Sequence, residues 1–256
     1  MNLYYKLLKQ PVFKMEDVQR YYHNINSARS AVSRLVSRGL AVKIRNDMYT
    51  CISGETEAPV ADRFQIASAI TTSSYVSHHT AMEYYGIADQ VFYDVYVASV
   101  TKFRSFTFDG YTYRYINAKF TEGVEFIEFS GGVRIADRER TILDSIKDMD
   151  KIAGMEEVTD NLWNIKRIHE KRMLHYLALY DNQFLYQKTG FLLSCIKMKL
   201  GLTDSFFDFC RNKIGKSTRY FSSDYPDGKF NSEWNLVVPD VLFGMKNGEL
   251  IHEFVN

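Results

Sequence analysis

The stretch Ser27–Ile52, SARSAVSRLVSRGLAVKIRNDMYTCI, predicts a helix followed by a two-stranded hairpin. Its apolar residues first recur at the spacing of one helix face, and Gly39 stands where such a helix would end. We expect Ser27 to cap the helix N-terminus. Two short apolar runs follow, and Arg45-Asn46-Asp47 joins them at hairpin spacing. Asn and Asp suit this turn because they tolerate positive φ.

The other face of this helix carries arginine and serine and no acid, whereas a merely solvated face would usually carry both signs of charge. Small hydroxyls admit close approach to DNA, and guanidinium groups reach phosphates or guanine edges. Two further cations lie near the hairpin tip. The predicted DNA-binding residues are Ser27, Arg29, Ser30, Ser33, Arg34, Ser37, Arg38, Lys43 and Arg45.

Two shorter helices are expected before this stretch, over residues 2–10 and 14–23. Helix, helix, turn, helix and hairpin is the order of a winged helix-turn-helix domain. We therefore predict such a domain over residues 1–55. The polar, turn-rich segment Gly54–Pro59 predicts a domain boundary.

The remaining chain, residues 59–256, predicts an α+β domain. Helices are expected over residues 59–86 and strands over residues 91–136, with Asp109-Gly110 forming a hairpin turn. Five strands with short turns predict a mainly antiparallel sheet. Further helices are expected over residues 137–214, before a tail with two extended pieces. A sheet followed by helices is typical of the α+β class.

Charge is unevenly placed along the chain. Its 256 residues carry a formal net charge of +1, but residues 1–50 hold nine Lys/Arg against three acids. The basic head on a mildly acidic body indicates that only the head meets a polyanion. No apolar run approaches the roughly 20 residues that span a bilayer. The scattered cysteines and the N-terminal MNLYYKLLKQ favour a cytoplasmic protein with reduced thiols.

The patterns that would indicate an enzyme are incomplete. His78, His79 and Glu83 lack a third metal ligand at suitable spacing. Asp109, Glu125 and Glu128 lie in the strand region, but no lysine follows them as a nuclease site would require. There is no glycine-rich phosphate loop and no nucleophile elbow. We expect no catalytic activity, no cofactor and no metal.

A second polar cluster lies at the start of the helix expected after residue 136, in the sequence ADRERTILD. A catalytic role for Asp137, Glu139 and Asp144 is conceivable, but the structural interpretation is better: Asp137 caps the helix and Arg140 pairs with an acid. The four residues singled out there are Arg138, Glu139, Arg140 and Asp144.

Three blocks together resemble AbiEi-type antitoxins of type IV toxin–antitoxin systems. They are the basic head, YVSHHTAMEYYGIADQV (Tyr75–Val91) and GVRIADRERTILDSI (Gly132–Ile146). The resemblance covers nearly the whole chain and is weakest after about residue 215. The family's hairpin typically ends in Arg-x-Gly-x-Tyr, whereas this chain has Asp47 at the position of the glycine, which places an acid near DNA.

The resemblance implies a non-enzymatic, cytoplasmic antitoxin of the abortive-infection (phage-resistance) type, monomeric in solution. Its head would repress its own operon at inverted repeats in double-stranded DNA. Its C-terminal domain would counter a nucleotidyltransferase toxin without a stable complex. Three alternatives stay open from the residues alone: a regulator that senses a small molecule, a nucleic-acid-modifying enzyme with a DNA-targeting head, and a head that docks proteins rather than DNA.

Overall fold

The computed structural model describes residues 3–152, 154–223 and 227–242. The fold is mixed α+β with antiparallel and mixed sheets. It divides into two compact units: unit 1 comprises Met1–Val76 and Phe92–Ile135, and unit 2 comprises Ser77–Val91 and Ala136–Asn256. The boundary expected at Gly54–Pro59 lies within unit 1, and the independent folding of residues 59–256 stays a prediction.

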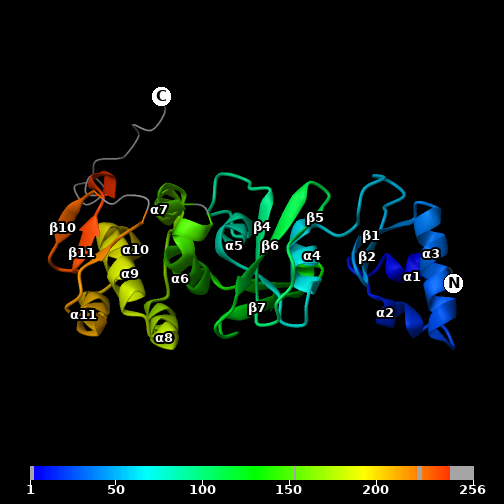
Figure 1. Ribbon diagram of the computed structural model, residues 1–256, viewed down its shortest axis with the longest axis horizontal. Helices are drawn as coiled ribbons and strands as arrows, with labels where there is room; N and C mark the ends of the chain where they lie inside the picture. Colours follow the sequence, from blue (N-terminus) through cyan, green and yellow to red (C-terminus); the bar gives the residue numbers. More distant parts are fainter. Residues whose placement is uncertain (1–2, 153, 224–226, 243–256) are drawn as a thin grey trace, which may run out of the picture. The chain divides into compact units, whose positions relative to one another are not determined.

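The N-terminal part of unit 1 contains three helices and a hairpin (Figure 1). These elements are α1 (Leu3–Leu7), α2 (Met15–Gln19), α3 (Ile25–Ser37), β1 (Ala41–Arg45) and β2 (Met48–Cys51). The strands β1 and β2 pair antiparallel, with an irregularity between Lys43 and Arg45. Phe13 adds a further antiparallel bridge to Tyr49 of β2. The segment between α1 and α2 thereby joins the hairpin.

The helix α3 begins earlier than the sequence pattern predicted. Asn24, not Ser27, is its N-cap, because the Asn24 side chain accepts a hydrogen bond from the Ser27 N–H at 2.9 Å. The prediction was wrong because Asn caps helices as well as Ser does, and Asn24 has the extended backbone conformation of an N-cap residue. The expected end is confirmed: Gly39 follows the helix with φ at +69°.

One hydrophobic cluster holds these first elements together. Leu7 of α1, Val18 of α2 and Val32 of α3 are buried in it with Phe13 and Cys51. Burial raises the pKa of the Cys51 thiol to about 11, so this cysteine packs as an apolar side chain. The apolar residues that recur at helical spacing, among them Ala28, Val32 and Leu35, are thus the residues that α3 buries.

The rest of unit 1 is built around a six-stranded sheet of order β5-β6-β4-β3-β8-β7. The strands are β3 (Tyr75–Val76), β4 (Asp94–Ser99), β5 (Phe106–Phe108), β6 (Tyr111–Asn117), β7 (Val124–Ile127) and β8 (Val133–Ala136), with a 3-10 turn at Glu128–Ser130. The helix α4 (Arg63–Ala69) packs on β3 and β4. It begins after the N-cap Asp62 rather than at Pro59.

The expected mainly antiparallel sheet is a mixed sheet. β5 and β6 form the predicted hairpin at Asp109-Gly110, and β3 pairs antiparallel with β4. However, β4 pairs parallel with β6, and β3 pairs parallel with β8. The two-residue strand β3 was missed because it is too short to show a period of two.

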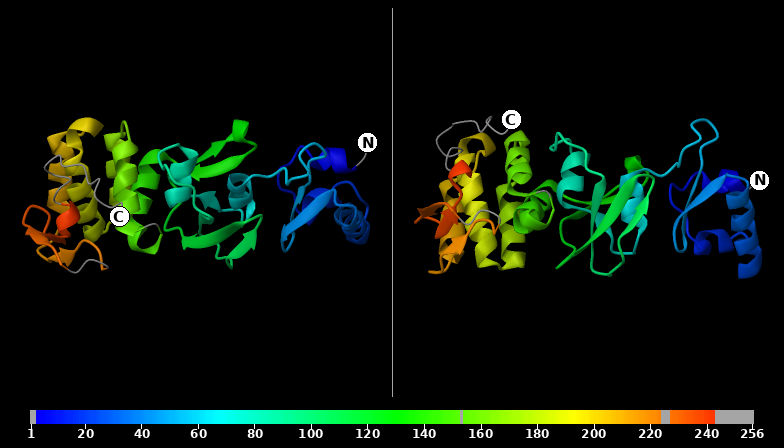
Figure 2. Two further views of the ribbon diagram at one scale, coloured as in Figure 1. Left: turned by 90° about the horizontal axis from the view of Figure 1, so that it is seen from above. Right: turned by 45° about the horizontal axis from the view of Figure 1, so that its top comes forward.

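Unit 2 is mainly helical, and Figure 2 shows its helices side by side. Its elements are α5 (His78–Tyr84), α6 (Arg138–Asp148), a 3-10 turn (Met149–Lys151), α7 (Gly154–Asn164), α8 (Glu170–Tyr180), α9 (Gln183–Cys195), α10 (Lys197–Leu200), α11 (Asp204–Lys213), β9 (Arg219–Tyr220), β10 (Lys229–Asn231) and β11 (Leu236–Val238). α6 packs against α5, α8 and α9, and α9 packs against α11.

The helices expected over residues 137–214 are α6 to α11. Residues 184–200 contain a break at Ile196, between α9 and α10. Thr203 is the N-cap of α11. The three short strands of the tail form a sheet of order β10-β11-β9. Buried Trp234 lies against Gly190, where a Cβ atom would meet the indole ring at 2.1 Å.

Candidate nucleic-acid interface

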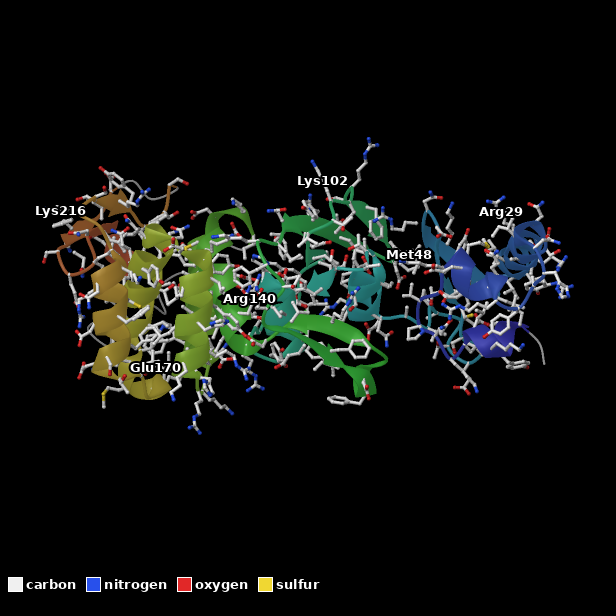
Figure 3. The ribbon with its side chains drawn as sticks, turned by 90° about the horizontal axis from the view of Figure 1, so that it is seen from below. Arg29, Met48, Lys102, Arg140, Glu170 and Lys216 are labelled. Atoms are coloured by element: carbon white, nitrogen blue, oxygen red, sulfur yellow. The ribbon has the colours of Figure 1, made fainter. Side chains whose placement is uncertain are left out.

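The arginine and serine side chains predicted to contact DNA lie on the solvent-facing side of α3. Figure 3 labels Arg29 there. Exposed residues of this helix recur opposite the buried apolar face, as an amphipathic helix requires. Together with the helix end they form what we term the α3 face: Arg29, Ser30, Ser33, Arg34, Ser37 and Arg38. Among the described residues, none of these three arginines forms an ion pair with an acid.

Two serines of the predicted set also have local roles. Ser27 is half-buried and donates its N–H to Asn24, so it belongs to the cap rather than to the exposed face. Ser37 donates its hydroxyl to the Arg34 carbonyl at 3.1 Å while staying exposed. The geometry therefore leaves Ser30 and Ser33 as the small residues at the middle of the α3 face.

The hairpin places its two cations differently. Lys43 is exposed. The Arg45 guanidinium instead lies 4.8 Å from the ring centre of Phe106 and 5.7 Å from that of Phe103. Burial lowers the pKa of Arg45 from its ordinary value. Arg45, predicted as a DNA contact at the hairpin tip, is thus half-buried over aromatic rings in this structure.

Asp47, the acid where the resembling family has glycine, has a partner within the head. Its Oδ1 accepts a hydrogen bond from the Met15 N–H, at the start of α2, at 3.1 Å. The residue adopts φ of +57° at the turn. A carboxylate is favourable at such a helix N-terminus, where backbone N–H groups lack partners. Asp47 therefore ties the hairpin to α2.

A groove of about 680 Å³ lies among α2, α3 and the hairpin. Arg29, Ser33 and Lys43 line it, and Glu16 and Asp47 add acids on the α2 side. Arg29 and Lys43 therefore lie at a groove rather than on a flat surface. Such a surface can hold phosphate groups along the helix and the hairpin, while short serines leave room for base edges.

The polar cluster at the start of α6 is buried, in contrast to the α3 face. Asp137 caps the helix by accepting the Arg140 N–H at 2.8 Å, as predicted. Arg140 is 1% exposed, and its Nε donates to Asp144 Oδ1 at 2.9 Å. The Tyr180 hydroxyl of α8 donates to the same carboxylate. Arg140 is labelled in Figure 3, within unit 2.

A second set of contacts from this cluster also reaches α8. The Asp137 carboxylate accepts the Tyr176 hydroxyl at 2.5 Å, and burial together with this contact raises the pKa of Tyr176. Glu139 accepts the His169 N–H at 2.7 Å. Arg138 is exposed, with its guanidinium over the Tyr85 ring. The cluster therefore fastens α6 to α8, and only Arg138 faces solvent.

The two histidines are buried, each with a carboxylate partner. His79 Nε2 lies 3.1 Å from Glu83, and His78 Nε2 lies 3.4 Å from Asp148. His78 starts α5 with φ at +53°. Within residues 3–152, 154–223 and 227–242, no group of three or more His, Cys, Asp or Glu side chains could hold a metal ion.

The acids considered for a nuclease site do not converge. Asp109 belongs to the hairpin of the edge strand β5, whereas Glu125 lies in β7 at the opposite edge of the same sheet. Two-metal hydrolysis needs acids that meet around ions about 4 Å apart. These two residues do not provide such a site.

Sequence reasoning missed a basic segment in unit 2. The run IKRIHEKR, residues 165–172, spans the whole α7–α8 connection and the first turn of α8, and its four Lys/Arg side chains are exposed. It was overlooked because charge was summed over the whole body, where acids outnumber bases. A shorter window would have found it.

No protein-family model matches the chain, and no curated protein matches it significantly. None of the helices that the structure describes is long and apolar enough to cross a membrane.

Proposed function

We propose that the chain is a DNA-binding autorepressor of the AbiEi antitoxin type, with residues 1–55 acting as a winged helix-turn-helix domain. The observation that carries the proposal is the α3 face: cations and serines, without an acid, on the exposed side of a helix that is followed by a hairpin. The hydrophobic cluster of the head and the net charge of +6 over residues 1–50 (nine Lys/Arg minus three acids) support the same interpretation. α3 would enter the major groove, and Lys43 would meet the backbone.

The salt dependence of binding tests the DNA part of the proposal. With Arg45 over aromatic rings, four cations remain for phosphates: Arg29, Arg34, Arg38 and Lys43. Four contacts predict that log K falls against log salt with a slope of about −3.6, from roughly −0.9 per contact. The measurement is fluorescence anisotropy with duplex DNA from upstream of the gene. A flat response would indicate a protein-docking head.

The antitoxin part rests on the resemblance of Tyr75–Val91 and Gly132–Ile146 to the family. We propose that the C-terminal domain, residues 59–256, counters a nucleotidyltransferase toxin encoded by the adjacent gene, without a stable complex and without catalysis by this chain. Co-expression of the two genes, scored for growth, tests it. Growth arrest by the neighbour alone and rescue by this chain are expected. A neighbour that is harmless, or harmful without rescue, would leave only the repressor.

A second candidate, a regulator that senses a small molecule, is favoured by one pocket of unit 2. Its volume is about 410 Å³, which is within the range of small-molecule sites. Aromatic side chains and one carboxylate give it an apolar wall with a polar group: Phe184, Tyr220, Phe221 and Asp150. Thermal stabilisation of the protein by one metabolite, together with altered DNA binding, would favour this function over the antitoxin.

A further inference from the structure

A pocket of unit 2 lies between the start of α9 and the residues that follow β9. Its volume is about 410 Å³. Two aromatic rings, those of Phe184 in α9 and Tyr220 in β9, line it together with the carboxylate of Asp150. The pocket therefore combines aromatic walls with one acid. Its lining is completed by Phe221, Ser222 and Ser223.

Hydrogen bonds join the walls of this pocket. The strand β9 pairs parallel with β11, and the next residue, Phe221, donates its N–H to the Val237 carbonyl at 2.9 Å. The Ser222 hydroxyl donates to Asp150 Oδ1 at 2.8 Å, which ties this segment to the turn after α6. Figure 1 labels α9 and β11. A pocket whose walls are tied together in this way is largely preformed, as small-molecule sites usually are.

Lys188 of α9 is buried beside the pocket, with only 3% of its side chain exposed. Its Nζ lies 3.6 Å from Asp150 Oδ2, 4.6 Å from the ring centre of Phe184 and 5.5 Å from that of Phe221. All three of these side chains line the pocket. The ammonium group therefore lies directly behind the pocket wall.

The neighbours of Lys188 compensate its charge only in part. The 3.6 Å to Asp150 is longer than a hydrogen bond, and no other acceptor of residues 3–152, 154–223 and 227–242 lies within hydrogen-bond distance of Nζ. Burial lowers the pKa of Lys188 even though the Asp150 carboxylate attracts the charged form. An ammonium group has three N–H donors, and buried donors without acceptors are costly. An acceptor supplied by a ligand would therefore stabilise this side chain.

A second cation, Arg219, borders the pocket. Its side chain is exposed, and its guanidinium lies 5.6 Å from the ring centre of Phe184. In the part of the chain that the structure describes, no acid lies within ion-pair distance of it. Two cations thus accompany the single carboxylate of Asp150, which suits a ligand with one negative charge. A cationic ligand is disfavoured, because the Phe184 ring already contacts both Lys188 and Arg219.

The aromatic walls indicate the body of that ligand. Tyr220 is 57% exposed and Phe184 is half-buried, so both rings offer surface to a further ring. We propose that the pocket binds a small aromatic carboxylate, whose ring packs against Phe184 and Tyr220. Its carboxylate accepts a hydrogen bond from Lys188 and is attracted by Arg219. The inference rests on the small-molecule-sensing candidate only in that both use this pocket, and it names the class of ligand.

The test uses the full-length chain and three probes that share one ring system: cinnamate, cinnamamide and cinnamylamine. Near neutral pH they carry a negative charge, no charge and a positive charge. Isothermal titration calorimetry measures the affinity for each. We expect cinnamate to bind at least about tenfold more tightly than cinnamamide, because it makes a hydrogen bond between charged groups. Cinnamylamine should bind most weakly.

Lys188→Met removes the charge and keeps the length of the side chain. It should lower the affinity for cinnamate at least about tenfold and leave that for cinnamamide unchanged, so that the preference for the anion is lost. The melting temperature should not fall, because the variant removes a buried charge that lacks a full partner. A merely structural role of Lys188 would instead lower the melting temperature and both affinities alike.

Two further variants test the border and the wall at exposed positions. Arg219→Gln should weaken cinnamate binding by about two- to fivefold, because it removes an exposed charge. Its control, Lys216→Gln, removes an exposed cation outside the pocket lining and should change nothing (Lys216 is labelled in Figure 3). Tyr220→Ala should weaken cinnamate and cinnamamide equally, by about two- to tenfold.

The proposal is overturned if the unaltered chain binds cinnamate no better than cinnamamide, or if Lys188→Met keeps the preference. Should Lys188→Met not fold, unchanged cinnamate affinity in both Arg219→Gln and Tyr220→Ala overturns it. Sensing is tested separately, by anisotropy with duplex DNA from upstream of the gene. Cinnamate that binds without altering DNA binding keeps the ligand site and excludes sensing of this ligand class. A chain that binds DNA but not cinnamate overturns the ligand inference alone.

Discussion

The α3 face and the start of α6 use the same charged residues in opposite settings. On α3, the arginines stand in solvent, and none forms an ion pair with an acid of the described residues. On α6, Arg140 and Asp144 are buried against each other, and the neighbouring acids are bonded to α8. An exposed cation is available to a partner and costs the fold little, whereas a buried one must be paired to be tolerated at all. The first arrangement should therefore respond to salt and ligands, and the second to mutation and acid.

The largest expected effect follows from breaking the buried pair. Replacing Arg140 with Ala removes the guanidinium group from the buried Asp144 carboxylate, which keeps its hydrogen bond from the Tyr180 hydroxyl. Loss of one partner of a buried ion pair costs about 3–5 kcal/mol of unfolding free energy. Urea denaturation measures it. The control, Arg138→Ala, removes the same charge from an exposed site and should cost less than about 1 kcal/mol. Equal losses would contradict the contrast between the two regions.

On the exposed side, the same substitution should alter binding rather than stability. Arg29→Ala and Arg34→Ala should each weaken operator binding by about 1–3 kcal/mol if the guanidinium reaches a base edge, and by less if it reaches only phosphate. The melting temperature should stay unchanged. Lys9→Ala is the control, because it removes one exposed charge of the head outside α3. An unchanged affinity in the double variant would exclude the α3 face as the DNA-binding surface.

Acid should affect the buried charges of unit 2 selectively. Burial alone would raise the pKa of Asp148, but its hydrogen bond to His78 and the nearby Lys147 outweigh burial and hold that pKa well below its usual value. Below about pH 4 the unfolded carboxyl therefore takes up a proton that the folded one does not, so stability falls as pH falls. Denaturation between pH 6 and 2 should show a shallower acid loss for Asp148→Asn. Asp208→Asn, at an exposed carboxylate, should follow the unaltered chain.

Features that depend on neighbours within a few residues could be predicted from the sequence, whereas pairings between distant segments could not. The α3 helix, the Gly39 end, the Asp109-Gly110 hairpin and the Asp137 cap depend on neighbours within a few residues, and all four are found. The N-cap of α3 was misplaced because Asn24 and Ser27 are both good caps. The parallel pairing of β4 with β6 could not be read, because a strand's alternation is the same whichever neighbour it pairs with.

The candidate site was predictable only in part for a related reason. Helical spacing told which side of α3 is exposed, so the arginines and serines there follow from sequence. It could not tell that Arg45, four residues before Tyr49 in the hairpin, lies over Phe103 and Phe106, more than fifty positions away.

The smallest effects should separate the two cations of the hairpin. Lys43 is exposed, so Lys43→Ala should remove one phosphate contact: the salt slope becomes shallower by about 0.9, with an affinity loss below that of either arginine of α3. Arg45→Ala should leave the slope unchanged, because its guanidinium is held over two rings, and should instead lower the unfolding free energy by about 0.5–2 kcal/mol. Anisotropy titrations and urea denaturation measure the two quantities on the same proteins. If Arg45→Ala reduces the slope as Lys43→Ala does, the guanidinium leaves Phe106 for phosphate when DNA binds, and the hairpin rather than α3 would be the part of the head that rearranges.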